Sequence, residues 1–270
     1  MRRFHEQSVL ITGASAGIGA ALARAFAHEG ARLTLLARRE DRLAVLAREL
    51  EAQGTRTLVQ RCDVTQDGEL EAAADVAREA FGGLDVVVAN AGFGVVGQVC
   101  DLTLDDFRRQ FETNVFGVLR TVQATVPDLR RSRGRLALVG SVAGWIARPG
   151  GAPYSMSKFA VRALADSLRL ELQPDGVAVT LISPGFIESE IRQVDNRGQH
   201  HEGKADKIPA WLRMPADECA QHVLRAIARR EREAVITGHG KALVYTERFA
   251  PWLLRGIGRA MPGKKWSGRE

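Results

Sequence analysis

Ser8-Val-Leu-Ile-Thr-Gly-Ala-Ser-Ala-Gly-Ile-Gly19 is the stretch that decides the fold of this chain. The run up to Thr12 is short and apolar, which predicts a buried strand. Gly13 allows a tight exit from the strand, Gly17 lets backbone approach an anion, and Gly19 permits close helix–sheet contact. The helical spacing that follows predicts a helix whose N–H groups face that anion. Taken alone, the turn is a weak signal, and its spacing G-x-x-x-G-x-G differs by one residue from the common G-x-G-x-x-G.

Apolar runs and segments of helical periodicity alternate along the rest of the chain. The predicted strands cover residues 8–12, 32–37, 57–61, 84–89, 135–140, 177–182 and 234–237. The predicted helices cover 18–28, 41–53, 67–81, a long segment from a Thr103-x-x-Asp106 capping box towards Pro127, 154–172 and 216–230. This order predicts an α/β protein with a single Rossmann-like doubly wound parallel sheet and helices on both faces.

Composition and charge narrow the class of protein. The 45% hydrophobic and 26% charged residues are typical of a globular chain. Three sparse cysteines make no metal pattern and fit a reducing compartment without structural disulfides. No apolar run approaches the roughly 20 residues of a membrane span, and a strand follows the N-terminus at once. We therefore expect a cytoplasmic protein. The net charge of +6 belongs to the C-terminal part, because residues 225–270 hold eleven basic and four acidic residues.

Tyr154-Ser-Met-Ser-Lys158 is the second informative stretch, with Ser141 upstream. If the segment is helical, residues four apart share one face, so the hydroxyl of Tyr154 and the ammonium of Lys158 can meet. A nearby cation favours the phenolate and lowers the tyrosine pKa from its reference of about 10. The alternative, a half-buried tyrosine beside a solvated lysine, is the usual interpretation of an isolated Y-x-x-x-K.

In combination, these motifs resemble those of the short-chain dehydrogenase/reductase family, from about residue 8 to about residue 237. The family's T-G-x-x-x-G-x-G occurs at residues 12–19, and its N-N-A-G occurs as Ala89-Asn-Ala-Gly92. Asn114 falls in the long predicted helix, Ser141 follows the fifth strand and Pro184-Gly185 follows the sixth. Ala89 departs from the family's first asparagine, at a position that supports the sheet.

The resemblance implies a nicotinamide cofactor, and the end of the second predicted strand indicates which one. NAD binders of this fold usually carry an acidic residue there, whereas this chain has Ala37 followed by Arg38 and Arg39. A missing carboxylate and an added guanidinium favour the 2′-phosphate of NADP(H), because a fork of donors matches phosphate oxygens. Arg38 is the principal candidate, assisted by Ser15 and Arg39. The alternative is two surface arginines that open a helix.

The resemblance also implies the remaining cofactor contacts. Asp63 and Val64 would hold the adenine, Asn90 and Gly92 would line its ribose, and Ser189 would offer a hydroxyl to the carboxamide. The full implied cofactor-binding set is Gly13, Ser15, Gly17, Ile18, Gly19, Arg38, Arg39, Asp63, Val64, Asn90, Ala91, Gly92, Tyr154, Lys158, Pro184, Gly185, Ile187 and Ser189.

Four residues would carry the family's reaction, in which hydride passes between the nicotinamide and a carbonyl carbon or an alcohol. Tyr154 would be the general acid in reduction and the general base in oxidation. Lys158 would hold the nicotinamide ribose and lower the tyrosine pKa. Ser141 would donate a hydrogen bond to the substrate oxygen, and Asn114 would hold a water that links Lys158 to bulk proton exchange. The expected function is that of an NADP(H)-dependent oxidoreductase.

The substrate is less visible than the chemistry. Apolar residues near the expected pocket mouth favour a lipophilic carbonyl compound or alcohol, and the alternative is that they anchor loops. The candidates are Phe93, Val142, Trp145, Phe186 and Trp211. The long polar segment 188–214 is expected to order over substrate, because connections of that length are often lids.

We expect residues 1–240 to form the dinucleotide-binding and catalytic domain and residues 241–270 a basic amphipathic extension. Pro251 should divide the extension into two short elements. Packing on the body is the favoured role; peripheral membrane contact or contact with a neighbouring subunit are alternatives. The resemblance implies a homodimer or homotetramer, and no nucleic-acid partner is expected. A non-catalytic NADP-binding sensor or scaffold is the competing function.

Overall fold

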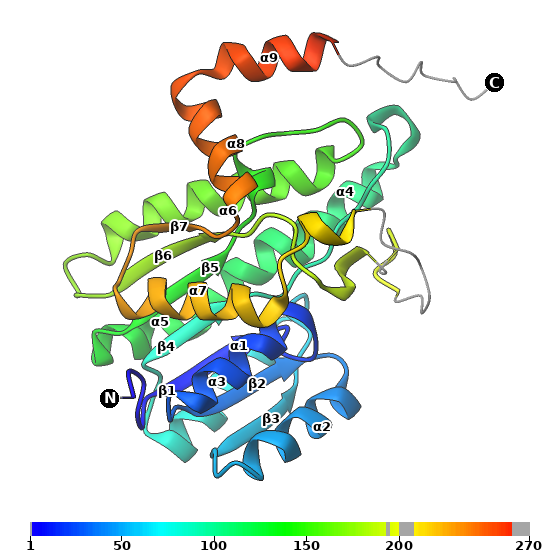
Figure 1. The fold of residues 1–270 in the computed structure, drawn as a ribbon. Helices are drawn as coiled ribbons and strands as arrows, with labels where there is room; N and C mark the ends of the chain where they lie inside the picture. Colours follow the sequence, from blue (N-terminus) through cyan, green and yellow to red (C-terminus); the bar gives the residue numbers. More distant parts are fainter. Residues whose placement is uncertain (1, 193–194, 200–207, 261–270) are drawn as a thin grey trace.

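Short strands rich in valine, leucine and alanine pair side by side at the centre of the protein, which we describe from a computed structural model (Figure 1). The structure describes residues 2–192, 195–199 and 208–260. Seven parallel strands form one sheet in the order β3-β2-β1-β4-β5-β6-β7. The strands are β1 (Ser8–Thr12), β2 (Arg32–Ala37), β3 (Thr57–Arg61), β4 (Val86–Ala89), β5 (Arg135–Val139), β6 (Ala178–Ser183) and β7 (Glu233–Val235).

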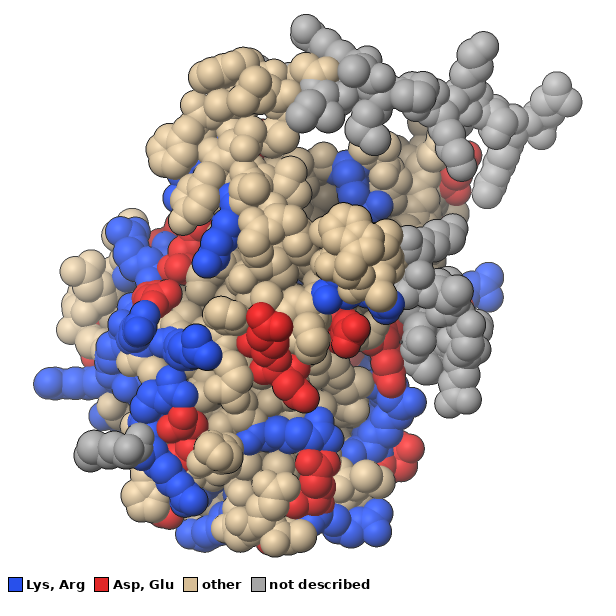
Figure 2. Space-filling view, in the orientation of Figure 1, with Lys and Arg blue, Asp and Glu red and all other residues tan. Residues whose placement is uncertain are grey.

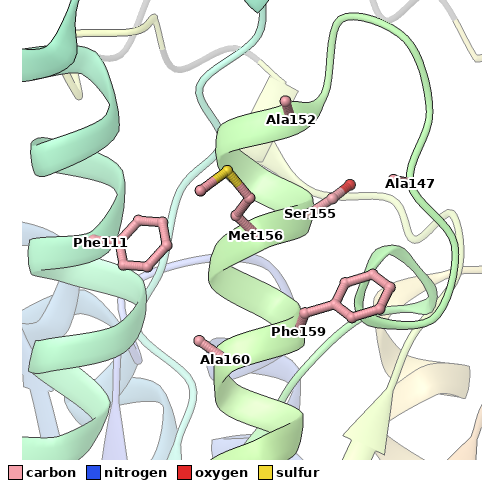
Figure 3. A pocket seen from close by; sticks show the side chains of 7 residues that line it. All are labelled: Phe111, Ala147, Ala152, Ser155, Met156, Phe159 and Ala160. Atoms are coloured by element: carbon pink, nitrogen blue, oxygen red, sulfur yellow. The ribbon is translucent and has the colours of Figure 1, made fainter.

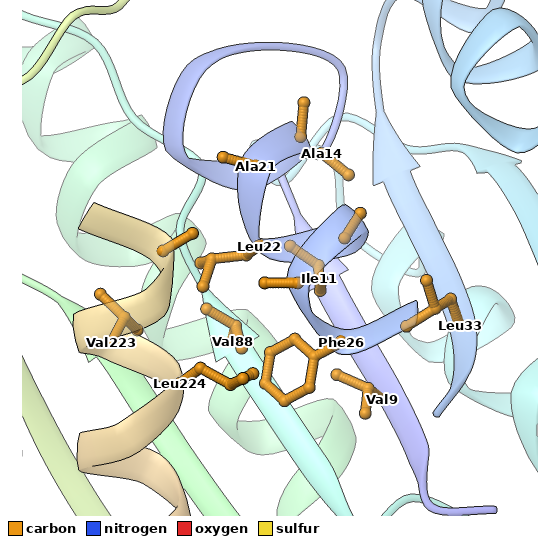
Figure 4. Packing of buried hydrophobic residues seen from close by; sticks show 14 of the residues in the cluster. Val9, Ile11, Ala14, Ala21, Leu22, Phe26, Leu33, Val88, Val223 and Leu224 are labelled. Atoms are coloured by element: carbon orange, nitrogen blue, oxygen red, sulfur yellow. The ribbon is translucent and has the colours of Figure 1, made fainter. Parts of the chain in front are cut away.

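Helices cover both faces of the sheet, as the fold class predicted. One face carries α1 (Gly17–His28), α2 (Glu40–Glu51) and α7 (Ala216–Ala228). The other carries α3 (Glu69–Phe81), α5 (Gly117–Ser132) and α6 (Ala152–Glu171). Because successive side chains of a strand point to opposite faces, Val9 and Ile11 join the first layer and Leu10 the second. Phe26 of α1 packs among Val9, Leu22 and Leu224 in the first layer (Figure 4).

The strand order places a crevice at the middle of the sheet. The chain leaves β1 towards β2 on one side, while β4 lies on the other, so the loops after β1 and β4 diverge at this point. Ligands of open α/β sheets bind outside the carboxyl ends of the strands at such a switch point. The glycine turn after β1 and the Ala89-Asn-Ala-Gly92 stretch after β4 both lie there.

The long predicted helix differs from the prediction in two ways. The Thr103 capping box forms, since Thr103 Oγ1 accepts from the amide of Asp106 at 3.3 Å and Asp106 Oδ2 accepts from the amide of Thr103 at 2.9 Å. After α4 (Leu104–Phe111), however, the chain makes a π-helical turn, Glu112–Phe116, before α5 begins. Helix α5 then continues through Pro127 to Ser132, because a proline removes only one helical hydrogen bond. Short 3₁₀ turns at Val99–Asp101, Val142–Gly144, Glu190–Arg192 and Ala210–Leu212 complete the connections.

The C-terminal extension forms two helices, and they divide at Pro251 as predicted. Helix α8 (Gly238–Phe249) begins at the capping hydroxyl of Thr237, which accepts from the amide of Gly240 at 3.1 Å. The predicted domain boundary after residue 240 therefore falls inside α8. Helix α9 (Pro251–Ala260) continues beyond α8 at the upper end of the molecule (Figure 1).

Helix α8 packs on the body of the protein, which is the role that the sequence analysis favoured for the C-terminal extension. Val244 is fully buried, and Arg248 lies over one face of the Trp145 ring, 4.7 Å from its centroid. The outer side of α8 and the start of α9 expose Tyr245, Phe249, Trp252 and Leu253. Uncharged atoms dominate this part of the drawn face, whereas Lys, Arg, Asp and Glu intersperse over the body below (Figure 2). Among the described residues, no helix combines the length and apolar composition that crossing a bilayer requires.

Candidate active site

The glycine turn between β1 and α1 has the geometry of an anion cradle. Gly13 and Gly17 have φ values of +66° and +53°, in the left-handed region that favours glycine. A Cβ on Gly13 would lie 2.9 Å from the Cα of Ala91, so the turn after β1 touches the backbone after β4. Ala16 carries no side-chain acceptor for the first N–H groups of α1. These N–H groups and the positive end of the helix dipole fit a pyrophosphate.

Asn90 fixes this turn from the neighbouring strand. Its side-chain amide donates to the carbonyl oxygens of Thr12 and Gly13, at 2.9 and 3.2 Å. The hydroxyl of Thr12 accepts in return from the amides of Asn90 and Ala91, at 3.0 and 3.1 Å. The N-N-A-G-like stretch therefore acts through Asn90 as a tie between β1 and β4, which keeps the cradle open.

Tyr154 and Lys158 lie on one helix, α6, as their spacing predicts. Tyr154 is half-buried, and the ammonium of Lys158 lies 5.7 Å from the centre of its ring. Lys158 is 4% exposed and donates to the carbonyl of Val139, at the end of β5, at 2.8 Å. Burial lowers the pKa of Lys158 to about 8. The lysine is therefore held against the sheet, not solvated, and the usual interpretation of an isolated Y-x-x-x-K does not apply.

Asn114 joins the tyrosine helix to the loop after β4. It is fully buried in the π-helical turn, where its Oδ1 accepts from the amide of Phe93 at 3.1 Å. Its Nδ2 donates to the carbonyl of Phe93 at 3.0 Å and to Ser157 Oγ at 3.2 Å. A Cβ on Gly92 would lie 3.0 Å from Asn114 Oδ1 and 3.8 Å from Lys158 Nζ. Asn114, Gly92 and Lys158 therefore converge at one point.

Gln110 is a positioning residue of the site that the sequence reasoning missed. It is fully buried one turn before Asn114, accepts from the amide of Val95 at 2.6 Å and donates to the carbonyl of Phe93 at 2.9 Å. Gln110 and Asn114 thus hold the loop after β4 by its backbone. Because a Cβ on Gly94 would lie 3.6 Å from Tyr154 Cδ2, this loop forms a wall beside the tyrosine ring. The available signal was a carboxamide four residues before Asn114.

Ser141 lies where β5 ends and the Val142–Gly144 turn begins. It is half-buried, and its hydroxyl accepts from the amide of Ala143 at 3.1 Å. The turn packs tightly on α6, because a Cβ on Gly144 would lie 2.7 Å from the carbonyl of Lys158. The structure thus brings the β5 end carrying Ser141 against the helix that carries Tyr154 and Lys158.

Basic side chains gather at the other end of the crevice, after β2. Arg39 donates to Ser15 Oγ at 3.3 and 3.4 Å, which places a guanidinium directly at the glycine turn. Arg42, which sequence reasoning missed, lies beside it because both arginines contact Glu190. Arg38, the principal sequence candidate, is exposed. The structure therefore places Arg39 and Arg42 beside the glycine turn, and the role of Arg38 stays a prediction.

The predicted adenine contacts after β3 have structural partners of their own. Asp63 Oδ1 accepts from the amide and the hydroxyl of Thr65, at 3.0 and 2.9 Å. Val64 is buried against Gly117 at the start of α5, where a Cβ would lie 2.6 Å from Val64 Cγ2. These bonds fix the loop after β3 beside the crevice.

The loop after β6 approaches the glycine turn from the opposite side. A Cβ on Gly17 would lie 3.1 Å from Ser189 Cβ, so Ser189 stands over the cradle. Ile187 is buried and forms a bridge with Met214. Gly185 is enclosed, since a Cβ there would lie 2.2 Å from Thr237 Oγ1. The loop is therefore held close to the place where a dinucleotide would lie.

His239, also missed by sequence reasoning, supports that loop. Its Nε2 accepts from the amide of Phe186 at 3.2 Å, and its ring stacks on Phe186 with centroids 5.3 Å apart. An N–H cannot point at another N–H, so Nε2 carries no proton and His239 is neutral here. Burial lowers its pKa, which favours that form.

The five predicted substrate residues do not share one environment. Phe93 is 9% exposed and Val142 and Phe186 are half-buried, whereas Trp211 is 83% exposed. Trp145 departs from the prediction: it is buried and donates from Nε1 to Ser183 Oγ at 3.2 Å. Arg162 and Arg248 lie 3.4 and 4.7 Å from its ring centroid. Trp145 therefore anchors α8, and this structural role replaces the expected place at the pocket mouth.

The segment 188–214, expected to order over substrate, is described only in part, because residues 193–194 and 200–207 lie outside the described residues. Within the described part, the side chain of Asn196 binds the backbone of Val96 twice, at 3.0 and 2.9 Å. The segment thus touches the loop that forms the wall beside Tyr154.

A glycine cradle at the switch point and a tyrosine–lysine pair on α6, held against the end of β5, define a dinucleotide-binding oxidoreductase. The family model of the short chain dehydrogenases matches residues 7–200. The chain therefore belongs to the short chain dehydrogenase family.

Individual relatives agree with this assignment. The chain is 35% identical over 256 residues to dehydrogenase/reductase SDR family member 7B of Bos taurus, covering 91% of this chain and 78% of that protein. An alcohol dehydrogenase from the archaeon Thermococcus sibiricus, complexed with 5-hydroxy-NADP, aligns with a TM-score of 0.74 at 32% identity, covering 85% and 95% of the two chains. A short chain dehydrogenase/reductase from Burkholderia phymatum, in complex with NAD, aligns with a TM-score of 0.82 at 27% identity, covering 99% and 100%.

Proposed function

We propose that this protein is an NADP(H)-dependent oxidoreductase that interconverts a carbonyl and a secondary alcohol on a lipophilic small molecule. The observation that carries the proposal is the pairing of Tyr154 with a buried Lys158 beside Asn114, in a crevice whose other end holds the glycine cradle. A protein that only sensed the nucleotide would need the cradle and not a buried ammonium beside a tyrosine.

The bound nicotinamide supplies or accepts the hydride. Tyr154 donates a proton to the substrate oxygen during reduction and removes it during oxidation. Lys158, whose ammonium is fixed by the carbonyl of Val139, puts a positive charge beside the Tyr154 ring, which favours the phenolate. Ser141 donates a hydrogen bond to the oxygen on which charge develops. Asn114 keeps the wall beside Tyr154 in place and holds a water that links Lys158 to bulk proton exchange.

The preference for NADP(H) rests on charge at the end of β2. Ala37 stands where a carboxylate would accept the ribose hydroxyls of NAD, and Arg39 reaches the glycine turn through Ser15. Guanidinium groups match the oxygens of a 2′-phosphate. Two solved relatives were found with different cofactors, 5-hydroxy-NADP and NAD. The preference between NAD and NADP must therefore be argued from the residues of the present chain.

The test is NADPH oxidation with a panel of ketones and aldehydes. Tyr154→Phe should lower kcat by roughly 10² to 10⁴, since it removes the general acid and leaves the ring in place. The matched control is Tyr245→Phe, because Tyr245 is the other tyrosine of the chain and is exposed on α8. Equal rates for Tyr154→Phe and wild type would refute the mechanism. Tight NADPH binding without turnover of any carbonyl would favour a non-catalytic sensor or scaffold.

A homodimer or homotetramer that uses α6 accompanies this function. The outward face of α6 forms a shallow apolar pocket of about 400 Å³. There Met156 points towards Phe111, and Phe159 lies further along the helix (Figure 3). Met156 and Phe159 are 50% and 40% exposed. Exposed apolar surface of this kind supports a subunit contact.

A further inference from the structure

A carboxylate from the loop after β6 bridges the two arginines at the end of β2. Glu190 Oε2 accepts from Arg39 Nη1 at 2.9 Å. Its two oxygens accept from Arg42 Nη1 at 2.6 and 2.7 Å. The three side chains are each about one third exposed, which leaves the cluster half-shielded from water. The arginine pair is therefore already holding an anion.

This contact crosses the crevice. In the sheet, β2 and β6 are separated by β1, β4 and β5, so groups that follow β2 and β6 can meet only above the ends of the strands between them. Arg39 also holds Ser15 of the glycine turn, and Ser189, the neighbour of Glu190, stands over Gly17. The bridge consequently lies over the place where the adenosine half of a dinucleotide binds.

The charge of Glu190 is secured by its partners. Burial alone would raise the pKa of its carboxyl, but hydrogen bonds from Arg42 and Arg39 outweigh burial and hold the pKa below the ordinary value. Glu190 is therefore ionised at neutral pH and offers two oxygens to the arginines. A phosphate monoester would offer three oxygens and more negative charge to the same donors.

We propose that Glu190 competes with the 2′-phosphate of NADP(H) for Arg39 and Arg42, so that these three residues together set the cofactor preference. Binding of the phosphate displaces the carboxylate from both arginines and opens the bridge across the crevice. A cofactor that lacks the phosphate leaves the bridge closed. This inference rests on the proposed NADP(H) preference and adds Glu190 as a residue that opposes binding of the 2′-phosphate.

The experiment measures binding by titration calorimetry, with 2′,5′-ADP as the phosphate-bearing probe and 5′-ADP as the probe without it. Glu190→Gln should lower the Kd for 2′,5′-ADP about tenfold and change that for 5′-ADP little, because the amide keeps the shape and loses the competing charge. Glu188→Gln is the matched control, since Glu188 is exposed in the same loop and, within the described part of the chain, bonds through its backbone amide to Met214.

The arginine arm uses Arg42→Ala, which should raise the Kd for 2′,5′-ADP about tenfold. Its control is Arg48→Ala, because Arg48 is the exposed arginine of α2. The melting temperature of ligand-free Glu190→Gln should fall slightly because the bridge is lost. A purely structural Glu190 would lower melting temperature and affinity together, whereas competition moves them in opposite directions.

The outcomes separate this inference from the proposed function. If wild type prefers 2′,5′-ADP, Arg42→Ala abolishes the preference and Glu190→Gln binds like wild type, then the competition is refuted while the NADP(H) preference stands. If wild type binds both probes equally, the preference itself is wrong and the competition falls with it. Tighter binding of 2′,5′-ADP by Glu190→Gln alone, with Glu188→Gln unchanged, supports both.

Discussion

Lys158 illustrates at the residue scale how the site opposes the stability of the fold. Its ammonium is 4% exposed and is fixed to the sheet by one carbonyl, that of Val139. Removing an ammonium from water is unfavourable, and the lowered pKa of about 8 records that penalty. The same burial places the cation beside Tyr154, where the reaction needs it.

The first prediction follows from this pKa. Between pH 8 and 10.5 the unfolded chain keeps a proton on Lys158 that the folded chain has lost, so raising the pH favours the folded state. Relative to Lys158→Met, the free energy of unfolding of wild type should rise over this range by an amount on the order of 3 kcal/mol. Below pH 8 the penalty is fully present. Chemical unfolding of both proteins across this range measures it, and a constant difference between them would contradict the prediction.

The second prediction concerns the buried carboxamide of Gln110. Gln110→Leu leaves the amide of Val95 and the carbonyl of Phe93 without partners, which should destabilise the protein by about 2–4 kcal/mol. The wall beside Tyr154 should loosen, so KM should rise in Gln110→Leu. Urea unfolding and steady-state kinetics check both effects. Gln123→Leu, an exposed change on α5, should alter neither.

At the element scale, the sequence predicted the strands well because the central ones are apolar runs bounded by turn residues, although β3 and β7 at the sheet edges are more polar. The glycine turn and the tyrosine–lysine helix were also predictable, since both depend on local spacing. The π-helical turn at Glu112–Phe116 was not, because its stretch Glu-Thr-Asn-Val-Phe has ordinary helical composition. A different reason explains why the sequence did not reveal Gln110, Arg42, Glu190 and His239. Each contacts backbone atoms or a residue distant in the sequence, and such contacts leave no motif in the sequence.

The third prediction separates the two C-terminal helices. Truncation after Ala250 removes α9 and keeps the contacts of Val244 and Arg248, so it should change the melting temperature little. Truncation after Thr237 also removes α8 and exposes one face of Trp145. It should lower the free energy of unfolding by several kcal/mol, since large buried side chains contribute about 2–5 kcal/mol each. Thermal unfolding of both truncations tests this, and equal melting temperatures would show that α8 is not anchored.

At the scale of the whole molecule, the doubly wound sheet determines where chemistry and cofactor can meet. Because every strand is parallel, the loops after β1, β4, β5 and β6 all emerge at one edge, and residues far apart in sequence converge there. We propose that the face of α6 opposite the crevice serves subunit contact, so that assembly and catalysis would use different sides of one helix.

The fourth prediction tests that division. Met156→Glu together with Phe159→Glu places two charges in the exposed apolar pocket and should convert the assembly to monomers, because buried unpaired carboxylates are strongly unfavourable. Light scattering after size-exclusion chromatography measures the mass. Leu170→Glu is the control for surface charge, since Leu170 is 70% exposed further along α6 and outside the pocket. A wild-type monomer, or an unchanged oligomer in the double variant, would contradict the proposed interface.

The loop after β4 has a consequence for changing the specificity of this protein. Gln110, Asn114 and Asn196 hold it only through main-chain N–H and C=O groups of Phe93, Val95 and Val96. The identity of the loop's own side chains does not enter those bonds. Val96 is 51% exposed, whereas Phe93 and Val95 are buried. Varying position 96 can therefore sample new binding surfaces while the backbone scaffold beside Tyr154 stays the same.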